Sequence, residues 1–143
     1  MYDLVVLPRQ LPACVTAAAS LPYLTFVLDH LGKPPIASGA LEPWATALRA
    51  LAALPNTAGK LSGLVTEADL ASWTVAGLRP YTDTALEAFG PDRLMFGSDW
   101  PVCTQTATYT QVLDMTRELT AVLDAPECSA VYEDTARRVY NLR

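Results

Sequence analysis

The sequence has little of what metal-binding and disulfide-bonded proteins depend on. Its 143 residues include one histidine, His30, and three cysteines. Cys14, Cys103 and Cys128 are odd in number, far apart and without a Cys-x-x-Cys pair, which excludes a zinc ribbon and a disulfide framework. Unpaired cysteines are typical of a reducing compartment, so we expect a cytoplasmic protein.

Long hydrophobic runs are also absent. Pro, Thr, Ser or charged residues interrupt every apolar stretch before the roughly 18 residues that a membrane-spanning helix needs, so we expect no transmembrane segment. Residues 13–19 resemble the apolar region of a secretory signal, but only one basic residue, Arg9, precedes them. An Ala-rich helix is the better interpretation of this segment.

Positive charge is scarce, with 10 Lys and Arg against 15 Asp and Glu and a net charge of -5. Nucleic acids and anionic membranes are bound by clustered Lys and Arg, so we expect neither of these partners. We expect a small-molecule substrate. The chain also has no Gly-x-Gly-x-x-Gly, Walker loop, Gly-x-Ser-x-Gly or His-Glu-x-x-His motif. Nucleotide binding, serine-esterase chemistry and zincin chemistry therefore have no support.

The chain does contain short apolar runs of strand length, and 51% of its residues are hydrophobic. The runs cover residues 4–7, 24–28, 60–65 and 93–96. They are nearly continuous, as in strands buried on both faces of a parallel sheet, and their starts lie about 20 to 35 residues apart, as in successive βα units. This pattern predicts an α/β fold in one domain, residues 1–143.

Helical signals fill the gaps between these runs. Apolar residues recur at helical spacing in segments 42–54, 80–89 and 109–123, and a last helix is expected from Pro126 to Tyr140. Pro43 suits a first helical turn, and Gly90-Pro91 is a strong stop signal. The chain is expected to end on a helix.

Three polar clusters follow the predicted strands, where ligands bind in parallel α/β proteins. His30 follows the second run, and its imidazole can bind a metal, polarise a carbonyl, or only make structural hydrogen bonds. Asp99 follows the fourth run in Gly97-Ser98-Asp99-Trp100-Pro101, and its carboxylate can accept a proton from water, ligate a metal, or cap the next segment. Asp29 is interpreted as a loop cap.

The third cluster is Lys60-Leu61-Ser62-Gly63. Alternation along a strand would place Lys60 and Ser62 on the same side, where they could bind an anion, although an exposed Lys60 is the simpler interpretation. Thr66-Glu67-Ala68-Asp69 is interpreted as helix-start capping.

Together, segments 26–34, 60–64 and 93–101 resemble the amidohydrolase-related (amidohydrolase 2) family, with its motifs in the same order. Within that family they are most similar to the lactonase branch of L-fuconolactonase, L-rhamnonolactonase and 2-pyrone-4,6-dicarboxylate lactonase. Residues 135–140 resemble the helix that closes these barrels. The resemblance implies the C-terminal half of a (β/α)8 TIM barrel, with about four parallel strands and flanking helices.

The resemblance also implies a hydrolase of sugar-acid or dicarboxylate lactones that attacks the carbonyl with activated water. Asp99 matches the last-strand aspartate that activates water or binds metal, and His30 matches a site histidine that ligates metal or polarises the carbonyl. Lys60 and Ser62 match a third motif and are expected to bind substrate, with Lys60 pairing a substrate carboxylate. A divalent metal such as Zn is implied for some members, while others work without one.

The family's opening His-x-His strand has no counterpart here, since His30 is the one histidine. A catalytic zinc usually takes about three protein ligands, and a complete barrel needs about 250 residues. We therefore expect an incomplete site made by a fragment. The alternatives are an inactive half-barrel that needs a complementary half-barrel or a second copy of itself, and a doubly wound ligand-binding domain.

Overall fold

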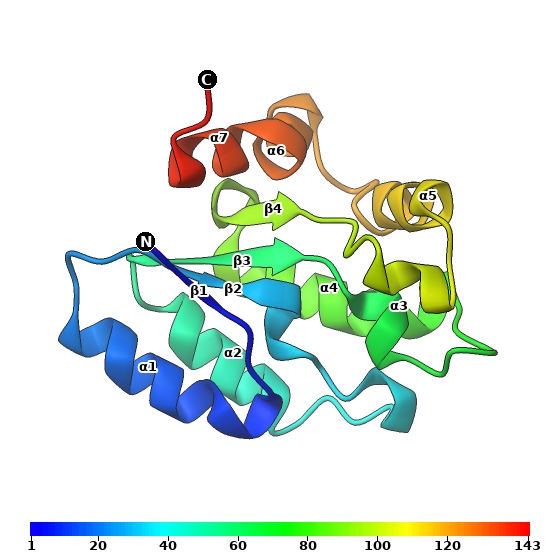
Figure 1. Ribbon diagram of the computed structural model, residues 1–143, viewed down its shortest axis with the longest axis horizontal. Coiled ribbons are helices and arrows are strands. Elements are labelled where there is room, and N and C mark those ends of the chain that lie inside the picture. Colours follow the sequence, from blue (N-terminus) through cyan, green and yellow to red (C-terminus); the bar gives the residue numbers. More distant parts are fainter.

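The computed structural model describes residues 1–143 and places a parallel sheet at their centre (Figure 1). The strands are β1 (Tyr2–Leu4), β2 (Phe26–Leu28), β3 (Thr57–Leu61) and β4 (Leu94–Phe96). The α-helices are α1 (Leu11–Ser20), α2 (Trp44–Ala52), α3 (Leu64–Glu67), α4 (Val75–Phe89), α5 (Tyr109–Leu119), α6 (Ala125–Ser129) and α7 (Thr135–Tyr140). Short 3-10 helices cover Pro8–Gln10, Asp29–Gly32, Ile36–Ser38, Pro91–Arg93 and Val102–Gln105, and a π-helical segment, Ala130–Asp134, joins α6 to α7.

The strands lie in the order β1-β2-β3-β4, and each neighbouring pair is parallel. Because every connection returns the chain to the same end of the sheet, all four carboxyl ends meet at one edge (Figure 1). Functional side chains of parallel α/β proteins gather at that edge. The α/β class and the parallel strands expected from the apolar runs are confirmed.

The two faces of the sheet have different partners. Leu28, Leu61 and Leu94 belong to a main core of 28 buried residues, to which α1, α2 and α4 also contribute. On the opposite face, Val27, Ala58 and Met95 form a small cluster under the C-terminal helix; the helix residues packed on it are Ala136, Val139 and Tyr140. Both faces of the strands are thus covered, as their continuous apolar runs predict.

The third strand lies earlier than the sequence predicts, at Thr57–Leu61 and not at residues 60–65. Ala58 and Gly59 carry no strand signal, but a Cβ at Gly59 would meet the Leu94 and Phe89 side chains at 3.2 Å, so a larger residue would force these side chains to shift. The strand ends before Gly63, whose φ of +67° turns the chain into α3. The apolar residues Leu64 and Val65 are therefore buried helix residues.

The first strand and the fourth helix also have shifted bounds. The strand covers Tyr2–Leu4 because it pairs with Phe26–Leu28, and Val5 is left 63% exposed beyond the pairing. Helix α4 starts at Val75 and contains Pro80, because the Thr74 hydroxyl accepts a hydrogen bond from the Gly77 N–H and caps the helix. No helix has the length and apolar character needed to cross a membrane.

Candidate active site

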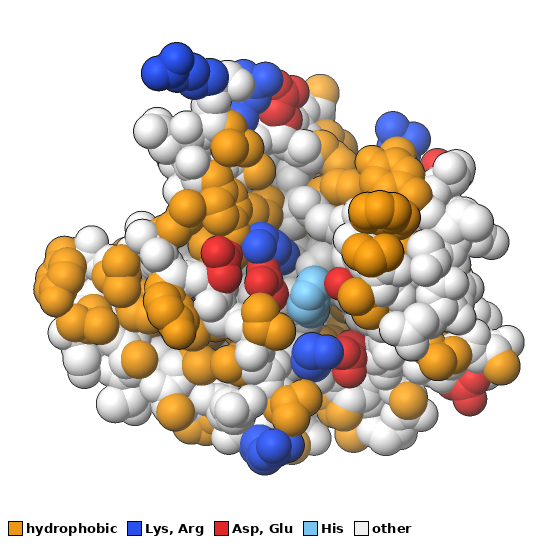
Figure 2. Space-filling model, viewed as in Figure 1, with side chains coloured by type: hydrophobic (Ala, Val, Ile, Leu, Met, Phe, Trp, Pro, Cys, Tyr) orange, Lys and Arg blue, Asp and Glu red, His pale blue; other side chains and the backbone are white.

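His30, Ser62 and Asp99 follow three neighbouring strands, β2, β3 and β4, and meet at the carboxyl edge of the sheet. Figure 2 shows the single histidine in the middle of one face, with basic and acidic side chains to its upper left and below it. The sequence-predicted residues His30, Ser62 and Asp99 thus come together in space.

The imidazole of His30 is held between the other two side chains. Its Nδ1 lies 2.8 Å from Oγ of Ser62, and its Nε2 lies 3.6 Å from Oδ1 of Asp99. The side chains of His30 and Asp99 are 22% and 11% exposed, so both are reachable from solvent and largely desolvated. The Ser62 contact fixes which ring nitrogen faces Asp99.

The backbone approaches the imidazole so closely that side chains are excluded. A Cβ at Gly63 would lie 2.9 Å from Cβ, Cγ and Nδ1 of His30, and a Cβ at Gly97 would lie 3.0 Å from Cβ of Ser62. His30 and Asp99 themselves have φ values of 52° and 57°. Asp and His tolerate this left-handed region better than most residues, and such conformations gather at functional sites.

Side chains of helix α3 contact both the loop that carries His30 and the loop that carries Asp99. The single hydroxyl proton of Thr66 is shared between two acceptors, Oδ2 of Asp99 at 3.2 Å and the carbonyl oxygen of Gly63 at 2.9 Å. Glu67, the next residue, accepts a hydrogen bond at 2.9 Å from Nζ of Lys33. The interpretation of Thr66 as a helix-start cap is wrong, because Thr66 lies inside α3, whose start at Gly63 has no side-chain cap, and its hydroxyl contacts the site carboxylate.

Lys60 lies in β3, on the side of the sheet that the C-terminal helix covers, and is paired with other residues of the protein. Its Nζ is 2.6 Å from Oδ1 of Asp29 and 3.4 Å from Oδ1 of Asp3, and it lies over the ring of Tyr140. Tyr140 Oη also donates to Oδ1 of Asp3. Burial lowers the pKa of Lys60, but its contacts with Asp29 and Tyr140 outweigh burial and raise that pKa above its ordinary value.

The interpretation of Asp29 as a loop cap is wrong. Its side chain makes no capping hydrogen bond in the Asp29–Gly32 turn and instead forms the ion pair with Lys60. A carboxylate that is only 12% exposed needs a cation nearby, and Lys60 supplies it. A sequence shows the residue but not this partner on the next strand.

His30 and Asp99 provide two of the donor atoms that a divalent metal requires. An imidazole nitrogen and a carboxylate oxygen, each about 2.0 to 2.2 Å from one zinc ion, would lie a little over 3 Å apart. The 3.6 Å between Nε2 of His30 and Oδ1 of Asp99 fits two ligands of such an ion. No group of three His, Cys, Asp or Glu side chains is close enough to hold a metal, so this pair would need further ligands from outside the chain.

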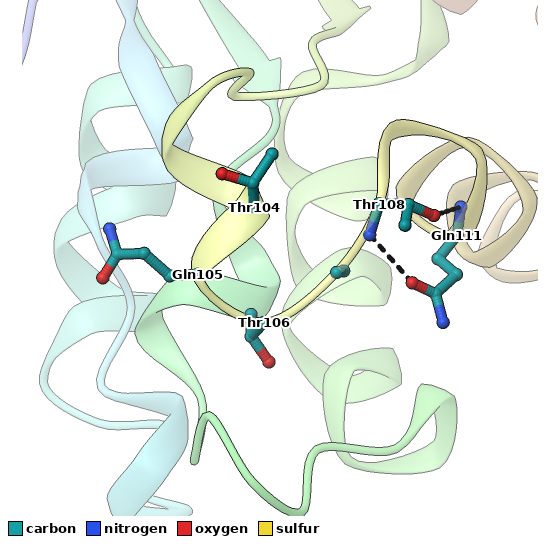
Figure 3. Close-up of a pocket in the computed structure, with 6 residues that line it drawn as sticks. Thr104, Gln105, Thr106, Thr108 and Gln111 are labelled. Carbon is teal, nitrogen blue, oxygen red and sulfur yellow. Dashed lines mark hydrogen bonds between the residues drawn. The ribbon is translucent and has the colours of Figure 1, made fainter.

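A surface hollow of about 380 Å³ lies at the start of α5 and is drawn in Figure 3. Thr108 and Gln111 form a reciprocal capping box there, with bonds of 2.8 and 3.2 Å that satisfy the helix start. No titratable side chain lines the hollow. The hollow therefore offers no group for acid–base chemistry, in contrast to His30 and Asp99 at the carboxyl edge of the four-stranded sheet.

The chain is similar to known proteins both in a family model and in the sequences of curated relatives. The family model described as Amidohydrolase matches residues 1–142. An L-fucono-1,5-lactonase of Burkholderia multivorans is 46% identical over 152 residues, which cover 99% of this chain and 51% of the relative. The chain therefore spans about half the length of the curated relatives it matches.

Solved structures agree with these matches. An amidohydrolase from Burkholderia multivorans with bound Zn has a TM-score of 0.95 and 46% identity, covering 99% of this chain and 52% of the other. A 2-pyrone-4,6-dicarboxylic acid hydrolase from Pseudomonas putida has a TM-score of 0.79 and 25% identity, covering 99% and 51%. The predicted resemblance and the predicted half of a (β/α)8 barrel are confirmed, and the chain belongs to the amidohydrolase family.

Proposed function

We propose that this chain supplies the part of a lactone hydrolase active site that activates water, and that the substrate is a sugar-acid lactone. The observation that carries the proposal is the convergence of His30 and Asp99 at 3.6 Å on the carboxyl edge of the sheet. Its 46% identity to an L-fucono-1,5-lactonase supports the choice of a sugar-acid lactone. A neutral lactone also needs no cationic pocket, which agrees with the pairing of Lys33 with Glu67 and of Lys60 with Asp29.

Asp99 acts as general base in this proposal. It takes a proton from water while the water oxygen attacks the lactone carbonyl carbon, which gives a tetrahedral oxyanion. The carbonyl then re-forms as the bond to the ring oxygen breaks, and the ring oxygen takes the proton that Asp99 had accepted, which gives the open hydroxy acid and restores the Asp99 carboxylate. His30, whose Nδ1 faces Ser62, presents Nε2 towards the reacting groups and can donate to the developing oxyanion.

In a metal-bound form, Nε2 of His30 would be a ligand in place of a donor, and it would hold the divalent metal together with Oδ1 of Asp99 and further ligands from other strands. When bound, it would polarise the carbonyl and lower the pKa of the attacking water. The bound Zn of the Burkholderia multivorans amidohydrolase supports this assignment.

Ser62 and Lys60 are proposed to hold other residues of the protein in place more than to bind the substrate. The Oγ of Ser62 is engaged by His30 at 2.8 Å. Lys60 already neutralises Asp29 at 2.6 Å, and a substrate carboxylate could pair with it only by displacing that partner. The expected pairing of Lys60 with substrate is therefore secondary to its role in the sheet.

The experiment is hydrolysis of L-fucono-1,5-lactone by the 143-residue chain, alone and co-expressed with the part of the Burkholderia multivorans relative that it does not cover. The wild-type chain is expected to give activity in at least one arrangement, and Asp99→Asn is expected to abolish it with an unchanged circular dichroism spectrum. Lack of activity in both arrangements, or wild-type activity in Asp99→Asn, would overturn the proposal.

A second candidate is an inactive half-barrel that requires a partner chain. The observation that favours it is the exposed apolar surface beside the edge strand β1, where Tyr2 and Val5 are 60% and 63% exposed. Size-exclusion chromatography with metal analysis separates the possibilities. A monomer without stoichiometric metal excludes a site built from two copies, whereas activity only after co-expression supports a complementary half-barrel.

A further inference from the structure

The carboxylate of Asp99 has different partners on its two oxygens. Oδ1 lies 3.6 Å from Nε2 of His30, and Oδ2 lies 3.2 Å from Oγ1 of Thr66. Rotation of a carboxylate about its Cβ–Cγ bond is broad and only weakly restricted by rotamer preference. A hydrogen bond to one oxygen is therefore needed if the other is to point in a fixed direction.

Thr66 is well suited to give that fixed direction because it is itself immobilised. Its branched side chain has restricted χ1 rotation, and its hydroxyl also lies 2.9 Å from the carbonyl of Gly63. The preceding α3 residues, Leu64 and Val65, are 2% and 1% exposed, and the following residue, Glu67, pairs with Lys33 at 2.9 Å. The hydroxyl thus belongs to a helical turn that is anchored on both sides.

The same turn also controls the histidine. Gly63, immediately before α3, contacts the imidazole of His30, and Ser62 before it contacts Nδ1. A single chain segment, Ser62 to Thr66, therefore touches both members of the His30–Asp99 pair. The bond from Thr66 to the Gly63 carbonyl alone does not explain this, because it needs no carboxylate 33 residues away.

We propose that Thr66 is a positioning residue for Asp99, which holds Oδ2 so that Oδ1 faces His30 and the attacking water. This inference rests on the proposed function of Asp99 as general base. Removal of the hydroxyl is expected to leave the carboxylate present but free to rotate. Substrate binding would then be preserved while turnover falls.

The test compares Thr66→Val, which keeps the shape and removes the hydroxyl, with Thr66→Ser, which keeps the hydroxyl. In the active arrangement, Thr66→Val is expected to lower kcat by on the order of ten- to a hundredfold with KM within about twofold, and Thr66→Ser to restore most of the loss. Thr104→Val is the matched control, because the Thr104 hydroxyl makes the same kind of bond, 2.7 Å to the carbonyl of Pro101, without an Asp99 contact.

A crystal structure of Thr66→Val gives a readout that is independent of activity, with the carboxylate of Asp99 expected to turn away from its 3.6 Å approach to His30. An unmoved carboxylate, unchanged kcat in Thr66→Val, or an equal loss in Thr66→Ser would overturn the role of Thr66. Asp99→Asn is measured in parallel. If it is inactive while Thr66→Val is normal, only this inference fails, and if it is fully active, the proposed function fails.

Discussion

Gly63 lies directly against the imidazole of His30, and a Cβ at Gly63 would be 2.9 Å from three atoms of that side chain. The contact is between backbone and ring, so neither partner can move away through a flexible side-chain end. Because Nδ1 of the same ring also faces Ser62 at 2.8 Å, any displacement changes where Nε2 points. The position of the histidine therefore depends on the absence of a side chain at residue 63.

Gly63→Ala is expected to damage both stability and activity. Its φ of +67° would cost about 1–2 kcal/mol for alanine, and the displaced imidazole would lower kcat by on the order of a hundredfold. Gly39→Ala is the matched control, since Gly39 has a φ of +69° and no atom within 4 Å of a new Cβ. Urea unfolding should show a loss in both variants, larger in Gly63→Ala because its Cβ also meets His30, and lactone hydrolysis should fall only in Gly63→Ala. Equal activity in the two variants would contradict the contact.

Lys60→Met tests the ion pair inside the sheet. The change leaves Asp29, which is 12% exposed, without its cation, and we expect a loss of about 1–3 kcal/mol in the free energy of unfolding at pH 7. Arg117→Met, at an exposed pair with Asp114, should change stability by less than about 0.5 kcal/mol. A Lys60→Met protein as stable as wild type would remove Lys60 from this structural role.

The same variant has an expected pH dependence. The pKa of Lys60 is raised in the folded protein above its ordinary value of 10.5, so its stabilising contribution is fully present below pH 10.5 and is lost as the pH rises further. The stability difference between wild type and Lys60→Met should therefore stay constant from pH 7 to about pH 10 and shrink above it. Urea titrations at a series of pH values measure this. A difference that disappears below pH 9 would contradict the raised pKa.

The sequence was sufficient for the fold class and for the residues at the strand ends. Continuous apolar runs predicted buried parallel strands, and the polar residues that terminate them, His30 and Asp99, proved to face each other. That inference works because parallel topology brings all carboxyl ends together whatever the details of packing. The predicted bounds of the third strand were less accurate. Glycine has low strand propensity, and Gly59 lies in β3 where the Leu94 and Phe89 side chains leave little space for a Cβ.

The contacts of individual side chains could not be predicted in this way. Thr66 carries an ordinary helix-start signal, and its bond to Asp99 depends on how α3 packs against a loop 33 residues away. Tyr140 lies 137 residues from Asp3 and meets it only because the C-terminal helix packs across the sheet. Such partners follow from tertiary packing, and the one local signal available was Gly63, next to Ser62, which marks a close approach of the backbone.

Trp44→Phe tests the support under the histidine loop. The indole is 1% exposed, and its Nε1 donates at 2.7 Å to the carbonyl of Leu31, the residue after His30. Phenylalanine keeps an aromatic ring near Tyr81 but leaves that buried carbonyl unpaired, so the free energy of unfolding should fall by about 1–3 kcal/mol. Trp73→Phe, at a half-buried indole that donates to Thr106, should cost less because water can replace the bond. Equal costs in urea unfolding would contradict this account.

Thiol labelling tests the packing around the Asp99 loop without any activity. Cys103 is fully buried beside that loop, and its backbone N–H donates to the carbonyl of Asp99 at 2.8 Å. Burial, and then the charge of Asp99, raise the pKa of the Cys103 thiol, and burial raises that of Cys14. The thiolate is the reactive species, so both thiols should be protected in the folded chain, whereas the half-buried Cys128 should react.

With a thiol reagent in excess at pH 8, one of the three thiols is expected to react before unfolding and the other two only in urea. Cys128→Ser should remove the fast reaction and leave the slow ones unchanged, which assigns the accessible thiol. If Cys103 reacted as fast as Cys128 in the native chain, the loop that carries Asp99 would open in solution. The 3.6 Å approach of Asp99 to His30 would then not be a fixed feature of the site, and the Thr66 and Gly63 variants would have smaller effects than those expected above.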